Sequence, residues 1–177
     1  MSVVIIGEVS NDLMRMQLYF KRMNIKEVHS FPSAELVIEY IQDPLKDAIE
    51  LIVLDVNMTL NNCEKICGKI NSLNHWIDVP ILLSTTYEKS EIIDRVFEAG
   101  IFDFILKPFD FMHFKSRIDV ALKYYKESNM RKFQEAQMQN DLLFAKKVQK
   151  NLLPSRLKRE HVECDGLYFT SNSLGGD

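Results

Sequence analysis

Acidic residues, a hydroxyl and a lysine follow separate apolar runs of the sequence. Glu8 comes directly after the first run, Asp55 closes the run LIVLD, and Thr85 and Lys107 close two later runs. A carboxylate can attack phosphorus to give an aspartyl phosphate, but two carboxylates repel a phosphate unless a hard cation such as Mg²⁺ bridges them. These residue types therefore indicate phosphoryl transfer.

Each residue has a place in such a site. Glu8 and Asp55 can hold the cation, together with the main-chain carbonyl of Asn57. Lys107 would neutralise one phosphoryl oxygen, and the Thr85 hydroxyl would donate a hydrogen bond to another. An Asp after a strand is often only the cap of the next helix, so the case rests on the whole set meeting at one edge of a sheet.

Alternating strands and helices are what would bring these residues together. Apolar runs rich in Val and Ile suit strands buried on both faces of a parallel sheet, and the segments between them show helical apolar stripes. This alternation predicts βαβ units in a doubly wound α/β sheet whose strand ends meet at one edge. The expected strands are Val3–Gly7, Lys26–Phe31, the run ending at Asp55, Val79–Thr86 and Ile101–Leu106, and the expected helices begin near Ser10, Ser33 and Tyr87, the last ending at Ala99 before a left-handed Gly100.

Composition sets further limits on function. The 177 residues carry a formal net charge of −3, which gives no argument for nucleic acid or membrane as a partner. No apolar run approaches the roughly 20 residues of a membrane span, and the start lacks a basic signal-peptide region, so we expect a cytoplasmic protein. Cys63 and Cys67 share an apolar stripe with Ile66 and Ile70, which predicts buried thiols rather than a metal pair.

Residues 1 to 125 resemble the receiver domain of two-component response regulators. The resemblance lies in four segments: DVNM at Asp55, PILLST ending at Thr85, Ala99-Gly100, and DFILKPF around Lys107. It implies a flavodoxin-like sheet of strand order 2-1-3-4-5, with Asp55 as phospho-acceptor from a histidine kinase. It also implies a switch that pairs Thr85 with Phe104, and a cis peptide between Lys107 and Pro108.

The sequence departs from the family pattern at two places. The family normally has two acidic residues after the first strand, but here the first is Gly7, which leaves Glu8 alone and suggests weaker metal binding. In the loop after Asp55, Thr59 and Asn62 replace the usual Pro and Gly, which suggests a different loop shape.

A single long helix is expected from Asp110 to Leu153, because Pro154 would interrupt it. It would be on the order of 65 Å long, about twice the span of a small domain. Its second apolar seam arrives one residue early relative to its first, a rotation of roughly 100°. We expect the first seam, with Phe114 at its start, to cover the receiver sheet. The second seam could pack only on a phosphatase domain or join two copies of the chain, and we expect a coiled-coil homodimer. The seams are Ile118, Leu122, Tyr125 and Asn129, then Met138, Leu142, Ala145, Gln149 and Leu152.

The end of the chain is similar to the opening of PPM-type serine/threonine phosphatases, in the branch that regulates sigma-factor partner switching. The similarity lies in the segment from Asp141 to Pro154 and in SLGGD at the end. It implies that Asp177 is a ligand of a two-metal centre holding Mn²⁺ or Mg²⁺, with a phosphoserine regulatory protein as substrate. We expect residues 126–153 to form the linker helix and residues 154–177 the start of a truncated phosphatase domain, without enzymatic activity in this chain.

Three functions compete on these observations. The first is a signalling module whose phosphorylation is relayed through the helix to a phosphatase domain. The second is an adaptor that binds a partner protein without phosphate. The observation in its favour is Gly7, which stands where the family normally has an acidic residue. The third, a regulator whose basic helix contacts nucleic acid, is the weakest, because from Lys115 to Glu160 the basic residues alternate with apolar ones and no recognition helix follows.

Overall fold

The computed structural model describes residues 1–41, 49–55, 60–72, 78–86, 94–95, 97–152, 157–159 and 162–164. These residues fall into two compact units, Met1–Ser128 and Asn129–Asp177. The first unit holds a five-stranded sheet with all neighbouring strands parallel, in the order β2-β1-β3-β4-β5. The predicted fold class and strand order are therefore confirmed. The strands are β1 (Ser2–Ile6), β2 (Glu27–Phe31), β3 (Ile49–Asp55), β4 (Ile81–Thr85) and β5 (Asp103–Leu106).

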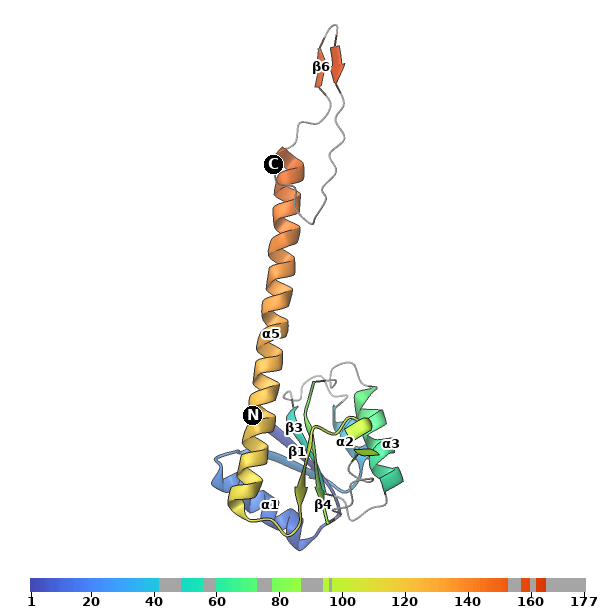
Figure 1. Ribbon diagram of the computed structural model, residues 1–177, viewed down its shortest axis with the longest axis vertical. Coiled ribbons are helices and arrows are strands. Elements are labelled where there is room, and N and C mark those ends of the chain that lie inside the picture. Colours follow the sequence, from blue (N-terminus) through green and yellow to red (C-terminus); the bar gives the residue numbers. More distant parts are fainter. Residues whose placement is uncertain are drawn as a thin grey trace. The chain divides into compact units, whose positions relative to one another are not determined.

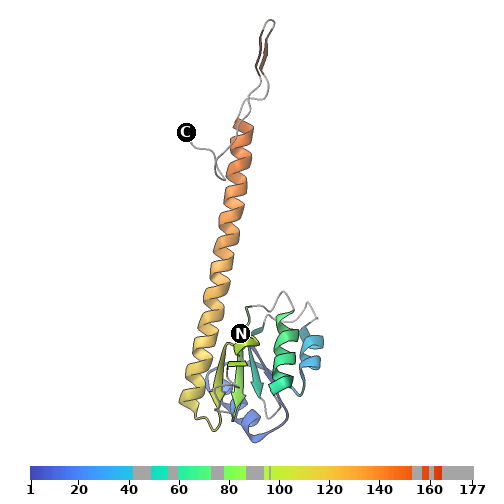
Figure 2. The ribbon, with the colours of Figure 1, turned by 45° about the vertical axis from the view of Figure 1, so that its right-hand side comes forward.

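Helices cover both faces of this sheet (Figure 1, Figure 2). Helices α2 (Ala34–Ile41) and α3 (Leu60–Asn71) contribute Val37, Cys67 and Ile70 to the core on one face. Helices α1 (Asn11–Arg22) and α5 (Phe111–Leu152) contribute Phe20 and Phe114, among others, to the core on the opposite face. The expected helix from Tyr87 to Ala99 lies largely outside the described residues.

Alternation along the strands divides the apolar side chains between the two cores. Val3 and Ile5 of β1 belong to the core with α1, whereas Val4 and Ile6 belong to the core with α2. Successive side chains of a strand point to opposite faces of the sheet. Because both faces are covered here, both sets of side chains are apolar and the sequence of β1 is a continuous apolar run. The pairing of β1 with β3 contains a register shift, because Ser2 is paired with Ile49 but the next residue, Val3, is paired with Leu51.

The first helix begins and ends where its sequence directs. The Ser10 hydroxyl oxygen accepts a hydrogen bond of 3.1 Å from the Leu13 amide, which satisfies one of the free donors of the first turn. After the last turn Asn24 adopts a left-handed φ of 64°, a conformation that Asn tolerates better than most residues. Leu13, Met16 and Phe20 are buried, so the predicted stripe does face the core.

Helix α5 runs from Phe111 to Leu152, close to the predicted bounds. The Asp110 carboxylate accepts a 2.8 Å hydrogen bond from the His113 amide and so caps its start. Phe114, Ile118 and Leu122 are buried in the core of the sheet, as expected of the first seam. Its later positions differ from the expectation, because Tyr125 is only partly buried and Asn129 is exposed. No helix in the described part of the chain is both long enough and apolar enough to cross a membrane.

The second unit contains a short antiparallel hairpin that the sequence interpretation did not include. Strand β6 (Leu157–Arg159) pairs with β7 (Val162–Cys164), with Leu157 opposite Cys164 and Arg159 opposite Val162. Asp177, the expected phosphatase metal ligand, lies outside the described residues.

Candidate functional site

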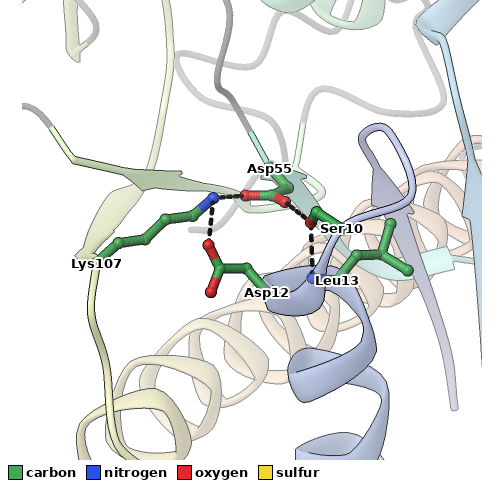
Figure 3. Close-up of polar contacts among 5 residues, drawn as sticks. All are labelled: Ser10, Asp12, Leu13, Asp55 and Lys107. Carbon is green, nitrogen blue, oxygen red and sulfur yellow. Dashed lines mark hydrogen bonds and ion pairs between the residues drawn. The ribbon is translucent and has the colours of Figure 1, made fainter.

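Asp55 is the last residue of β3, at the edge of the sheet where the parallel strands end. Its side chain is almost completely buried. Oδ1 forms an ion pair with Lys107 Nζ, and Oδ2 accepts a hydrogen bond of 3.3 Å from the Ser10 hydroxyl (Figure 3). Burying a carboxylate is costly unless it is paired and hydrogen-bonded, and these two contacts supply both kinds of partner.

Lys107 follows β5 directly and reaches Asp55 across the intervening strand β4. Its amide donates a 2.8 Å hydrogen bond to the Thr85 carbonyl oxygen, and its peptide bond to Pro108 is cis, as the resemblance implied. The Lys107 side chain is 4% exposed, and its ammonium group lies between two carboxylates, that of Asp55 and, at 3.2 Å, that of Asp12. This placement gives the strand ends one buried positive charge.

The contact between Asp55 and Lys107 is electrostatic. Within the described residues, neither Asp55 Oδ1 nor Lys107 Nζ has a hydrogen bond of good geometry. Both buried atoms can therefore take a further partner, such as a phosphoryl oxygen on Nζ or a cation on Oδ1. This is the property that the chemistry expected from the sequence requires.

Thr85 and Phe104, the expected switch pair, lie on adjacent strands. Thr85 ends β4 and is buried, and it is paired in the sheet with Leu106. Phe104 is paired with Leu83, two residues earlier, and its half-buried ring meets Phe97 edge-on at 6.1 Å between centroids. The structure thus brings the two residues onto adjacent strands near the same edge of the sheet.

The remaining expected site residues are less closely engaged. Glu8 lies just beyond β1 and is exposed, and no hydrogen bond or ion pair among the described residues joins it to Asp55 or Lys107. Asn57 lies outside the described residues. The described residues contain no group of three or more His, Cys, Asp or Glu side chains that could hold a metal ion.

A Mg²⁺ ion nevertheless fits the donors at hand. Mg²⁺ is usually held by one or two carboxylates and keeps several of its waters. Asp55 offers a buried oxygen without a hydrogen bond, and Glu8 follows the neighbouring strand. The site therefore suits a cation bound by few protein oxygens, although the acid that the family has at position 7 is missing.

Gly7 packs directly against Asp55. A Cβ atom on Gly7 would lie 2.8 Å from Asp55 Cβ, closer than real Cβ contacts come, and 3.0 Å from the Asp55 carbonyl oxygen, which is also tight. A side chain at position 7 would fit only if Asp55 or the backbone beside it shifted. The glycine at position 7 thus belongs to a close approach between the backbone after β1 and Asp55, which the sequence alone did not reveal.

Two residues of the site were not expected from the sequence. Ser10 and Asp12 were interpreted only as residues of a helix start, yet Ser10 contacts Asp55 and Asp12 contacts Lys107 (Figure 3). The available signal was the position of SND immediately after Glu8, at the same strand edge as Asp55. A polar helix start at that edge could have been considered part of the site.

The fold and this edge define a flavodoxin-like domain with an acidic site at the ends of its strands. The profile of the family described as "Response regulator receiver domain" matches residues 3–119. The chain belongs to this family. Its members generally bind Mg²⁺ at the phosphorylation site, and its response regulators are phosphorylated by histidine kinases.

Individual relatives agree with this assignment. The chain is 27% identical over 115 residues to the sensory transduction protein LytT of Bacillus anthracis, a match that spans 65% of this chain and 44% of that protein. It is 24% identical over 99 residues to the heme response regulator HssR of Staphylococcus aureus, which spans 56% and 42%. The chemotaxis response regulator CheY4 of Vibrio cholerae superposes with a TM-score of 0.57 at 19% identity, covering 68% of this chain and 98% of that one. The chain thus spans less than half the length of these two curated relatives.

Proposed function

We propose that this chain is a phosphorylated signalling module in which Asp55 receives a phosphoryl group from a histidine kinase. A carboxylate oxygen of Asp55 forms a bond to phosphorus, while the bond from phosphorus to the donor nitrogen breaks and its electron pair leaves with the donor. The observation that carries the proposal is the buried ion pair of Asp55 with Lys107 at the strand edge.

The other predicted residues have supporting roles in this proposal. Glu8 and Asp55, with the main-chain carbonyl of Asn57, would hold Mg²⁺, which offsets the negative charge gathered by the acidic side chains and the phosphoryl group. Lys107 would bind one phosphoryl oxygen and the Thr85 hydroxyl another. Thr85 is buried at the end of β4, and β4 pairs with β3, the strand that carries Asp55. This position supports a role for Thr85 in binding the phosphoryl group.

A change at Thr85 would reach the protein surface through Phe104. Movement of the Thr85 hydroxyl toward a phosphoryl oxygen would make room behind it, and the half-buried ring of Phe104 on the next strand could turn inward. Such a coupled pair has two discrete arrangements, which is what a population shift between states requires.

Acetyl phosphate with Mg²⁺, followed by intact mass measurement, tests the proposal. The parent chain is expected to gain about 80 Da, one added phosphoryl group, and Asp55→Asn to gain none, because the amide is not a nucleophile toward phosphorus. An Asn variant that gains the mass as readily as the parent would show that the acceptor lies elsewhere.

The output proposed for the longer protein is a PPM-type phosphatase. Helix α5 would carry the change from the receiver as a dimeric helix, and Asp177 would join other carboxylates in a centre that binds a pair of Mn²⁺ or Mg²⁺ ions. The substrate would be a phosphoserine regulatory protein in the cytoplasm. Since two-metal hydrolysis needs several carboxylates, this chain should release no phosphate from a phosphoserine peptide with Mn²⁺.

A second candidate is an adaptor that binds its partner without phosphate. The observation in its favour is Gly7, which removes one acid of the cation site and leaves no room to restore it. This function predicts no mass gain in the parent and a partner that binds the parent and the Asp55→Asn variant equally well.

A further inference from the structure

Asp12 contacts the acidic site from helix α1 rather than from a strand end. It is the second residue of α1, and its Oδ2 lies 3.2 Å from Lys107 Nζ. Asp12 is 33% exposed, whereas the lysine side chain is 4% exposed. The Asp12 carboxylate is therefore the outer partner of a buried ammonium group.

The start of α1 is itself fixed to Asp55. The Ser10 hydroxyl oxygen accepts a hydrogen bond from the Leu13 amide, which caps the helix, and the same hydroxyl donates a hydrogen bond to Asp55 Oδ2. Figure 3 shows the resulting closed path from Asp55 through Ser10 and the first turn of α1 to Asp12, and back through Lys107. Such a path sets the position of Asp12 relative to Asp55 without a flexible loop between them.

Asp12 gives the buried Lys107 ammonium a carboxylate partner in addition to Asp55. Lys107 is buried, and a buried ammonium with too few partners is costly. The backbone packing at Gly7 excludes an acidic side chain from that position. When Asp55 becomes an acyl phosphate, Lys107 exchanges its contact with the Asp55 carboxylate for one with a phosphoryl oxygen, whereas the Asp12 carboxylate is left unaltered by the reaction.

We propose that Asp12 is a positioning residue that holds the Lys107 ammonium at the site before and after phosphorylation. The part concerning phosphorylation rests on the proposed function. The contact between Asp12 and Lys107 does not, so the two can be tested separately.

The first test observes Lys107 without any phosphate. Ammonium protons that are buried beside two carboxylates are shielded from water and exchange slowly, and a nitrogen-15 NMR spectrum should show them as a signal that Lys107→Met removes. Asp12→Asn should broaden or abolish that signal, and Asp12→Glu, which keeps the carboxylate, should retain it. Asp119→Asn, which removes an exposed aspartate paired with Lys115 on α5, should also leave it unchanged. An unaltered Lys107 signal in Asp12→Asn would overturn the proposal.

The second test measures the rate of phosphorylation by acetyl phosphate across a series of Mg²⁺ concentrations. Asp12→Asn should lower the rate at saturating Mg²⁺ roughly tenfold, as expected for the loss of a residue that orients another. If instead that variant only needs more Mg²⁺ and reaches the parent rate at saturation, Asp12 is a cation ligand and the positioning role is wrong. A parent that is never phosphorylated on Asp55 would contradict the proposed function, while the NMR result would still decide whether Asp12 holds Lys107.

Discussion

Gly7 and Asp55 meet backbone to side chain across β1 and β3, with only 2.8 Å between Asp55 Cβ and the place where a Gly7 side chain would begin. The contact favours a residue without a side chain at position 7. It also makes the spacing of the two central strands sensitive to a single methyl group. Interiors are packed too closely to absorb such an atom without movement.

We predict that Gly7→Ala destabilises the protein by about 1–3 kcal/mol, the usual cost of overpacking. Gly68→Ala is the matched control, because Gly68 lies in α3 with nothing within 4 Å of its added Cβ. That change should stabilise the protein by up to about 1 kcal/mol through helix propensity. Urea unfolding measures both. Equal stability of Gly7→Ala and the parent would show that β1 and β3 separate at no cost.

A second prediction concerns the part of α5 that belongs to the receiver core. Phe114 is fully buried and its ring packs against Phe20 at 5.0 Å and Phe109 at 5.5 Å between centroids. Phe114→Ala should lower the free energy of unfolding by about 3–5 kcal/mol. Phe133→Ala, on the same helix but 69% exposed, should change it by less than about 0.5 kcal/mol. Similar losses in both variants would mean that the core extends well beyond the first turns of α5.

The third prediction is a pH dependence at the ion pair between Glu35 of α2 and Lys69 of α3. The hydrogen bond from Lys69, at 2.9 Å, is the main cause that lowers the pKa of Glu35 from 4.5 to about 2. A lowered pKa means that the ionised form favours the folded state, so the stabilisation is present above pH 4.5 and is lost as the pH falls toward 2. Glu35 is 67% exposed, and solvent screening limits the effect to about 0.5 kcal/mol or less.

Glu35→Gln should therefore lower the urea midpoint slightly at pH 6, and the difference from the parent should narrow between pH 4.5 and pH 2. Glu39→Gln, an exposed change on the same helix, provides the comparison. A difference for Glu35→Gln that widens on acidification would show that the pKa is shifted in the opposite direction.

The sequence was sufficient to place the residues that stand at strand ends. Asp55, Thr85 and Lys107 each follow an apolar run, and in a parallel sheet the ends of such runs must meet. Ser10 and Asp12 could not be placed in this way, because a polar residue at a helix start is explained equally well by capping. Their contacts depend on how α1 lies against the sheet, which is a matter of tertiary packing.

The close approach at Gly7 and the β6–β7 hairpin also lay beyond the sequence. A glycine at a strand end is compatible with a turn, a bulge or a close contact, and only the distance between β1 and β3 decides among them. The hairpin strands have three residues each, too few for a period of two to stand out.

The last prediction concerns the second apolar seam of α5. Met138 is 76% exposed and Leu142 is only half-buried, although their spacing continues through Ala145 and Gln149 in the 4-3-4 pattern of a coiled coil. Apolar seams of this kind are stable when they face a second helix, and two copies of one chain supply it with closed symmetry. We predict a homodimer joined through this seam, with Gln149 as a tolerated polar position.

Light scattering at micromolar concentration should give twice the monomer mass of 20.7 kDa. Leu142→Asp should return the mass to that of the monomer, because it places a charge in the seam, where it would be buried without a partner. Leu143→Asp is the matched control: it makes the same change one residue along, roughly 100° around the helix, at a side chain that is 62% exposed. A dimer that survives Leu142→Asp but dissociates in Leu143→Asp would place the contact on the neighbouring face of the helix, and a monomeric parent would exclude the coiled coil altogether.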